Sequence, residues 1–162
     1  MHDSDKYFMK CAIFLAKISE MIGEVPVGAV LVFNNTIIGK GLNSSILNHD
    51  PTAHAEIKAL RNGAKFLKNY RLLHTTLYVT LEPCIMCYGA IIHSRISRLV
   101  FGAKYKNLQK YICCKNHFFI NKNFRKISIT QEVLESECSN LLSSFFKRKR
   151  KIATKYFNNN II

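Results

Sequence analysis

The stretch TLYVTLEPCIMCYGAIIHS, Thr76 to Ser94, decides the fold. Its first part, TLYVT, is a short apolar run that is typical of a buried strand. Its second part, PCIMCYGAIIHS, predicts a helix, and Pro83 suits the first turn of a helix because its missing N–H needs no partner there. A buried strand that leads at once into a helix indicates a protein of the α/β class.

Further elements extend this unit in both directions. Upstream, VPVGAVLVF (25–33) and TIIGKGL (36–42) predict two strands joined by a tight turn at Asn34-Asn35. Downstream, RLVFG (98–102) and KISIT (126–130) predict two more strands. Three further helices are indicated by apolar stripes at Phe8, Cys11, Ala12, Leu15, Ile18 and Ile22 (ended by Gly23), at Ala53, Ile57, Leu60, Ala64 and Leu67, and at Val133, Leu134, Cys138, Leu141, Leu142, Phe145 and Phe146. A hairpin followed by alternating helices and strands predicts a three-layer α/β/α sandwich around a five-stranded mixed sheet.

The length of 162 residues suits one domain with its own core. We expect a single domain over residues 1–151 and a frayed tail over residues 152–162. The longest apolar runs are far shorter than the roughly 18 residues that a membrane span needs. The N-terminal MHDSDKYFMK lacks the apolar segment of a signal peptide. These features lead us to expect a cytoplasmic protein.

Positive charge is concentrated in the C-terminal part of the chain. Residues 1–94 hold nine Lys and Arg against seven Asp and Glu, whereas residues 95–162 hold fifteen against three. Such an asymmetry favours a polyanionic partner, most often a nucleic acid. A genome of biased composition that favours Lys, Asn and Ile would give a similar excess, so charge alone leaves both explanations open.

The six cysteines are spaced too irregularly for a disulfide framework, and the close pair Cys84 and Cys87 indicates metal or redox chemistry instead. At the start of a helix the two thiols lie on one face, where the helix dipole favours thiolates. His54 stands at the start of another predicted helix. One imidazole and two thiolates suit zinc, and three protein ligands leave a fourth position for water. Cys11 and Cys138 fall on apolar faces and are expected to be buried small side chains.

Glu56 lies two residues after His54, on the first turn of the same predicted helix. There it can stand beside a zinc-activated water without being a ligand, and carry the proton of that water to a leaving group. Three other interpretations compete. The cysteines could form a redox pair, Glu56 could lie on a solvated helix face, or a structural zinc could take its fourth ligand from His49, His74, His93 or His117. A redox pair would explain neither His54 nor Glu56, and we expect His93 to face away from the cysteines.

The pattern HAE followed by PCIMC resembles the signature of the zinc-dependent nucleobase deaminases, in the cytidine/deoxycytidylate deaminase superfamily. Further stretches, among them EVPVGAVLV, HDPTAHAEI, NYRL, VFGA and LLSSFFKRKR, look like the bacterial tRNA-specific adenosine deaminases. The likeness covers residues 1–104 and 126–151.

The resemblance implies hydrolytic deamination of the wobble adenosine, the first anticodon base of an arginine tRNA, to inosine by a cytidine-deaminase-like homodimer with one zinc ion per subunit. It implies His54, Cys84 and Cys87 as zinc ligands and Glu56 as the proton carrier. It further implies that Asn43 binds the target base, that Val25, Pro26 and Leu81 line the walls, and that Phe145, Phe146, Lys147 and Arg150 contact the anticodon loop. Core packing is the alternative for the two phenylalanines, and we expect it to account for at least one of them.

The chain departs from the pattern of these relatives after FGA (101–103). Lys104 and Tyr105 stand where Arg-Asp is expected, and the segment to Arg125 has no glycine. Tyr105 can stack on a base but cannot replace a carboxylate as an acceptor, so a changed preference for the ribose is a hypothesis. Two rival functions remain: a deaminase of free cytosine, cytidine or guanine, and a catalytically silent, zinc-stabilised RNA-binding subunit.

Overall fold

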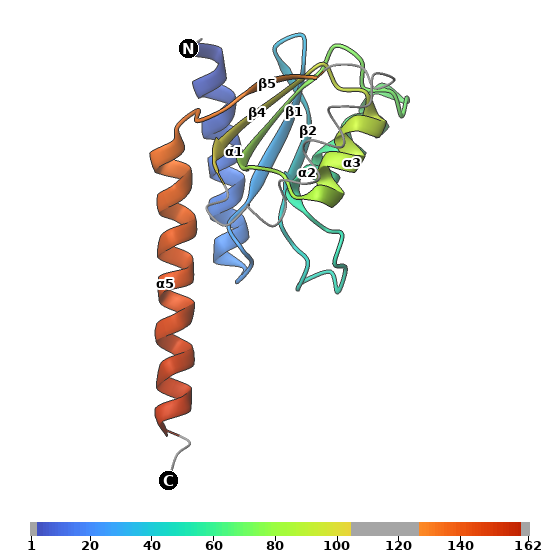
Figure 1. Ribbon diagram of the computed structural model, residues 1–162. Helices are drawn as coiled ribbons and strands as arrows, with labels where there is room; N and C mark the ends of the chain where they lie inside the picture. Colours follow the sequence, from blue (N-terminus) through green and yellow to red (C-terminus); the bar gives the residue numbers. More distant parts are fainter. Residues whose placement is uncertain (1–2, 105–126, 160–162) are drawn as a thin grey trace.

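A five-stranded sheet forms the centre of the computed structural model, which describes residues 3–104 and 127–159 (Figure 1). Its strands are β1 (Gly28–Phe33), β2 (Thr36–Leu42), β3 (Thr76–Leu81), β4 (Arg98–Ala103) and β5 (Ser128–Thr130), in the spatial order β2-β1-β3-β4-β5. β1 is antiparallel to β2 and β3, whereas β4 is parallel to β3 and β5. The predicted mixed sheet is confirmed.

The turn between β1 and β2 is built as its sequence predicts. Asn34 and Asn35 both have positive φ angles, 47° and 57°. This is the backbone that a two-residue hairpin turn requires, and asparagine tolerates it better than most residues. The local sequence therefore sets the register next to the turn, where Phe33 pairs with Thr36 and Val32 with Ile37. A bulge between Leu31 and Val32 then shifts the remaining pairs by one residue.

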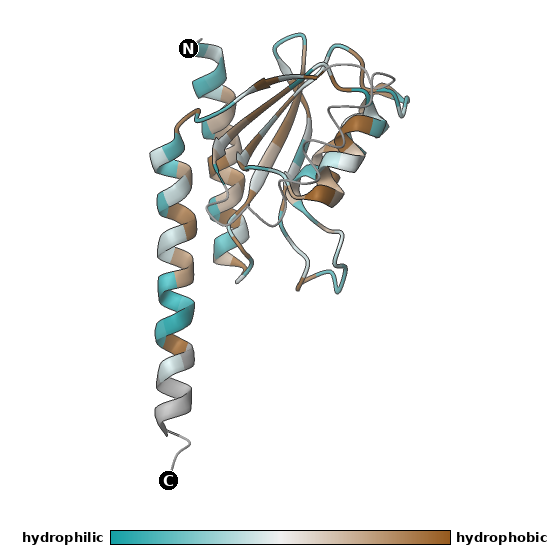
Figure 2. Ribbon diagram, in the orientation of Figure 1, coloured by the Kyte–Doolittle hydropathy of each residue, from teal (hydrophilic) through white to brown (hydrophobic). Residues whose placement is uncertain are grey.

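Helices cover both faces of the sheet in the described part of the chain. α1 (Asp3–Met21) and α5 (Glu135–Asn159) lie on one face, and α2 (Ala55–Leu67) and α3 (Ile85–Ser94) lie on the other (Figure 1). Alternate residues of each strand pack into the two layers; in β1, Leu31 joins the core under α2 and α3, whereas Val30 joins the core under α1. The strands between the helices carry the hydrophobic colour in Figure 2. The three-layer α/β/α sandwich is confirmed.

Two glycines in β2 bring the first turns of α2 against the sheet. A Cβ atom on Gly41 would lie 2.0 Å from the carbonyl oxygen of Ala55, and one on Gly39 would lie 2.2 Å from that of Ala59. Any side chain would push the helix outward, so glycine is required for this close approach. The contact places the start of α2, where His54 stands, beside the end of β2.

Several boundaries differ from those that the sequence predicted. α3 begins at Ile85, so Pro83 precedes the helix, and the idea that Pro83 lies within its first turn was wrong. Val25 to Val27 form a bend before β1 in which the Val27 N–H donates to the Val25 carbonyl at 2.8 Å. α5 continues to Asn159, where a frayed tail was predicted from residue 152. No helix among the described residues is both long and apolar enough to cross a membrane.

A partly buried ion pair, in which Asp5 is buried whereas 29% of the Arg98 side chain is exposed, ties α1 to the parallel strands. Asp5, which is 2% exposed, accepts two hydrogen bonds of 2.8 Å from the Arg98 guanidinium and one of 2.8 Å from the Tyr78 hydroxyl. The hydrogen bond with Asp5 raises the pKa of Arg98. Burial is the main cause that raises the pKa of Tyr78, and the hydrogen bond with Asp5 is the second. The pair therefore joins α1 to β3 and β4 on the face opposite α2 and α3.

Replacing Asp5 with alanine is expected to lower the free energy of unfolding by about 2 kcal/mol, because the Arg98 guanidinium and the Tyr78 hydroxyl would lose their charged hydrogen-bond partner. Denaturant titration of the purified protein measures this. Asp3→Ala on the same helix is the control, since Asp3 is exposed and should cost less than about 1 kcal/mol. Equal losses in the two variants would contradict a specific role for the pair.

Candidate metal and active site

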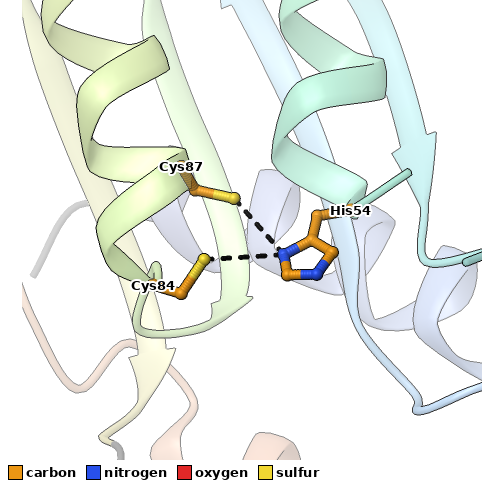
Figure 3. Close-up of side chains that lie close together, drawn as sticks. All are labelled: His54, Cys84 and Cys87. Atoms are coloured by element: carbon orange, nitrogen blue, oxygen red, sulfur yellow. Dashed lines mark hydrogen bonds between the residues drawn. The ribbon is translucent and has the colours of Figure 1, made fainter. Parts of the chain in front are cut away.

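The three residues of the predicted metal set come together where two helices begin (Figure 3). His54 is the N-cap of α2, and Cys84 is the N-cap of α3. Cys87 lies on the first turn of α3 and is buried, whereas Cys84 is exposed. All three side chains point into the space between the helix ends, where unpaired N–H groups and the helix dipoles favour thiolates.

The spacing of the three ligand atoms fits zinc. The Sγ atoms of Cys84 and Cys87 lie 3.6 and 3.5 Å from Nδ1 of His54, and the three atoms lie within 4.8 Å of one another. When a tetrahedral zinc ion binds a sulfur and a nitrogen at its usual bond lengths, the sulfur and the nitrogen lie about 3.6 Å apart. The geometry therefore accommodates the ion without moving the backbone.

The protons of the three groups are coupled through short contacts. The hydrogen bond from Cys87 lowers the pKa of Cys84 to about 4, and the same bond, together with burial, raises the pKa of Cys87. The contact with Cys84 also raises the pKa of His54. Without metal, the site therefore favours one thiolate, on Cys84. When a cation binds, the Cys87 thiol proton and any proton on Nδ1 of His54 must leave, whereas Nε2 of His54 can keep its proton.

No fourth His, Cys, Asp or Glu joins this set within residues 3–104 and 127–159. His49, His74 and His93 are exposed and lie outside it; His117 lies outside the described residues. Among the described side chains the set thus has three ligands, which is the pattern of catalytic rather than structural zinc.

Glu56 is buried at the start of α2, with 4% of its surface exposed. Burial is the main cause that raises its pKa, and the charge of Cys84 raises it further. Its carboxyl group also lies within hydrogen-bonding reach of the Cys87 thiol. A solvated position for Glu56 is therefore wrong. A buried carboxyl of raised pKa beside a three-ligand metal set is suited to proton transfer near neutral pH.

The residues predicted to surround the base lie on neighbouring segments. Asn43, buried with 9% exposed, follows β2 directly, and its backbone N–H donates to the Val27 carbonyl at 2.9 Å. Pro26 is buried and Val25 half-buried on that same bend. Leu81 ends β3, three residues before Cys84. The Ser44 N–H donates to the carbonyl of Ala53, which precedes His54, so these segments meet beside the metal set.

The predicted RNA-contacting residues of α5 lie in the other helical layer. Phe145 is buried at 7% exposed, whereas Phe146 is 44% exposed, so core packing accounts for one phenylalanine, as expected. Their rings meet edge to face at 5.4 Å between centroids. Lys147 and Arg150 are exposed. Tyr105 lies outside the described residues, as do Cys113 and Cys114.

Two buried polar residues at this site escaped the sequence analysis. Ser19 on α1 is fully buried, and its hydroxyl donates to the carbonyls of Val25 and Asn43 at 3.0 and 2.8 Å. Glu24 is 2% exposed and contacts the Asn43 side chain. The only local signal for Glu24 was its position directly before an apolar segment, and an acidic residue in such a position is far more often exposed to solvent.

The fold and the metal set together define a zinc-dependent deaminase. The model of the family described as "Cytidine and deoxycytidylate deaminase zinc-binding region" matches residues 2–103. The chain therefore belongs to the cytidine and deoxycytidylate deaminase family, and the matched region includes His54, Glu56, Cys84 and Cys87. The zinc-binding character of that region agrees with the donor set and spacing observed here.

Two relatives with high sequence identity are named tRNA-specific adenosine deaminases. The chain is 56% identical to the tRNA-specific adenosine deaminase of Buchnera aphidicola subsp. Schizaphis graminum over 90% of this chain and 96% of the relative. It is also 56% identical to that of Haemophilus influenzae, over 91% and 86%. A solved structure from work on A-to-I editing by tRNA:A34 deaminases superposes with a TM-score of 0.75 at 35% identity, covering 84% of this chain and 99% of the other.

Proposed function

We propose that this protein is a zinc-dependent hydrolase that converts the wobble adenosine of a tRNA, the first anticodon base, to inosine. The observation that carries the proposal is the buried Glu56 carboxyl beside a three-ligand metal set. The 56% identity to tRNA-specific adenosine deaminases over nine-tenths of the chain supports the choice of substrate.

In this reaction His54, Cys84 and Cys87 hold the metal, and Glu56 moves the proton. Zinc, when bound, supplies a Lewis acid that makes a water molecule acidic enough to attack near neutral pH. Glu56 accepts a proton as the water oxygen adds to C6 of adenine, and returns it to the amino nitrogen as the C6–N6 bond breaks. The products are inosine and ammonia, so no redox partner is needed.

Base binding falls to the segments beside the metal set. Asn43 supplies the polar group that contacts the base, and Val25, Pro26 and Leu81 supply apolar surface around it. All four lie on the bend before β1 or directly at the ends of β2 and β3, close to His54 and Cys84. A base must leave its stack to enter such a site, and anticodon-loop bases are already unstacked.

α5 provides the charge for an RNA backbone. Residues 147–151 are consecutive bases, all exposed, and form the hydrophilic stretch of α5 in Figure 2. The exposed ring of Phe146 lies next to them and offers a stacking surface. Lys147 and Arg150 are therefore assigned to phosphate contacts.

The finer parts of the proposal concern the particular tRNA and the assembly. We assign an arginine tRNA as the substrate and a homodimer as the working form, because the sequence resembles a family with both properties. We also assign the reaction to the cytoplasm, as for a bacterial tRNA-modifying enzyme. Tyr105, where the relatives are expected to carry an acid, is assigned to the neighbouring nucleotide.

Incubating the zinc-loaded protein with an anticodon stem-loop of arginine tRNA is expected to give inosine at the wobble position alone. Because the exposed bases of α5 bind phosphates, kcat/KM for the stem-loop should fall about tenfold or more between 50 and 200 mM salt. Reverse transcription locates the inosine. Ammonia released from free cytidine, cytosine or guanine, with no inosine in RNA, would contradict the tRNA assignment. Binding of RNA without any deamination would instead indicate a silent RNA-binding subunit.

A further inference from the structure

Glu24 lies fully inside the protein, between the end of α1 and the segment that carries Asn43. Only 2% of its surface is exposed. Its Oε2 atom accepts a hydrogen bond of 3.2 Å from Nδ2 of Asn43, and its Oε1 atom accepts one of 2.8 Å from the backbone N–H of Leu47. One carboxylate therefore holds both the side chain of Asn43 and the loop that follows it.

The chemistry of Glu24 decides which way the Asn43 amide faces. Both carboxyl oxygens of Glu24 act as acceptors, one for the Leu47 N–H and the other for Asn43, so the amide turns its NH2 group toward Glu24. Because the amide is planar, its carbonyl oxygen Oδ1 then points away from Glu24. A flipped amide would bring two acceptors together in a buried place, at a high cost in free energy.

The backbone of Asn43 is held independently of its side chain. Its N–H donates to the carbonyl of Val27 at 2.9 Å, and its carbonyl accepts the Ser19 hydroxyl at 2.8 Å. The next residue, Ser44, is bound to Ala53, directly before His54. Because the backbone of Asn43 is anchored beside the metal set, its side-chain amide can still rotate, and the hydrogen bond to Glu24 fixes which way the amide faces.

We propose that Glu24 is a positioning residue for base recognition, which fixes the Asn43 amide so that Oδ1 is presented to the substrate base. This inference rests on the proposed function, in which Asn43 binds that base. Glu24 itself touches neither the metal ligands nor the reacting atoms. It acts through Asn43, so its loss should affect catalysis without affecting the metal.

The test is a reciprocal exchange of the two side chains. Glu24→Gln keeps the shape of the side chain, but its oxygen can accept from only one of the two donors, the Leu47 N–H and the Asn43 NH2 group. The glutamine NH2 group then faces the other donor, so the Asn43 amide must flip or lose its hydrogen bond. Asn43→Asp sets two carboxylates together. The double variant restores a complementary pair, because the introduced glutamine can accept from the Leu47 N–H and donate to the introduced aspartate, which still turns an oxygen toward the base.

Each single variant is expected to lose about 100-fold in kcat/KM for the stem-loop, as removal of a fixed polar contact at a reacting group does. The double variant should be at least about tenfold more active than Asn43→Asp, since coupled sites do not act additively. Glu137→Gln, an exposed acid on α5, is the control. Multiplied losses in the double variant, or a Glu24→Gln variant within about threefold of the parent, would overturn the proposal.

Two further measurements separate this inference from the proposed function. If the parent protein releases ammonia from a free purine but leaves RNA unchanged, the parent, the two single variants and the double variant are compared on that purine, with the same expected order of activities. The side-chain NH2 protons of Asn43, followed by NMR in the zinc-loaded protein, should exchange with solvent far more slowly than those of Asn34 in the exposed turn. Equal exchange rates would overturn the proposal even if a variant failed to fold.

Discussion

Replacing Glu56 with glutamine is expected to lower kcat by about 1,000-fold or more while the protein still binds one zinc ion. Glutamine has the shape of glutamate but can neither take a proton from water nor return it to the leaving amine. Glu56 is not one of the three residues that form the metal set, so the ion should remain bound. Single-turnover formation of inosine and metal analysis of the same sample measure the two quantities.

The control for this variant is Glu137→Gln, which removes an exposed carboxylate far from the first turn of α2. It should keep parental activity within about twofold, as exposed surface changes usually do. Loss of zinc in Glu56→Gln would mean that Glu56 supports the metal rather than the proton transfer. Full activity in this variant would remove the carboxyl from the reaction altogether.

Removing zinc with a chelator is expected to abolish deamination and to make the Cys84 thiol reactive. Without the ion, the contact with Cys87 keeps the pKa of Cys84 at about 4, so Cys84 is a thiolate at any pH above that value. Cys84 is also exposed, whereas Cys87 and Cys138 are buried with raised pKa values. Iodoacetamide should therefore modify Cys84 before Cys87 and Cys138.

The pH dependence gives this prediction its sign. An ordinary thiol loses reactivity as the pH falls below about 8 because its thiolate is protonated, whereas Cys84 should react at a nearly constant rate down to about pH 5. Mass spectrometry of the modified peptide measures the rate at each pH, and zinc-loaded protein is the control. A rate that falls tenfold per pH unit from pH 8 downward would show that Cys84 has an ordinary pKa.

Adding zinc back should release protons, because the raised pKa of Cys87 keeps its thiol protonated in the free site and a metal ligand must be a thiolate. The release can be followed with a pH indicator in weak buffer. Restored activity together with proton release would tie the reaction to the three-ligand set. Activity that survives full removal of zinc would contradict the proposed mechanism.

Much of the fold could be predicted because it depends on local patterns. The two asparagines of the hairpin turn and the apolar runs of β3 and β4 are features of a few adjacent residues, and the strands appeared where those features indicated them. Helix ends were predicted less well. Cys84 proved to be the N-cap of α3 rather than part of its first turn, because its backbone is extended and only its carbonyl joins the helix, accepting the Tyr88 N–H at 2.9 Å.

The sequence by itself determined which chemical groups are available: an imidazole, two thiols and a carboxyl at helix starts, and a run of bases at the end of the chain. The tertiary structure alone decided how they are used. It set the spacing of 3.5 and 3.6 Å that fits zinc, buried Phe145 while exposing Phe146, and enclosed Glu24 against Asn43. The physical reason is distance along the chain. Periodicity and turn chemistry act over a few residues, whereas burial and hydrogen bonding join residues 19 to 33 positions apart, which no local pattern records.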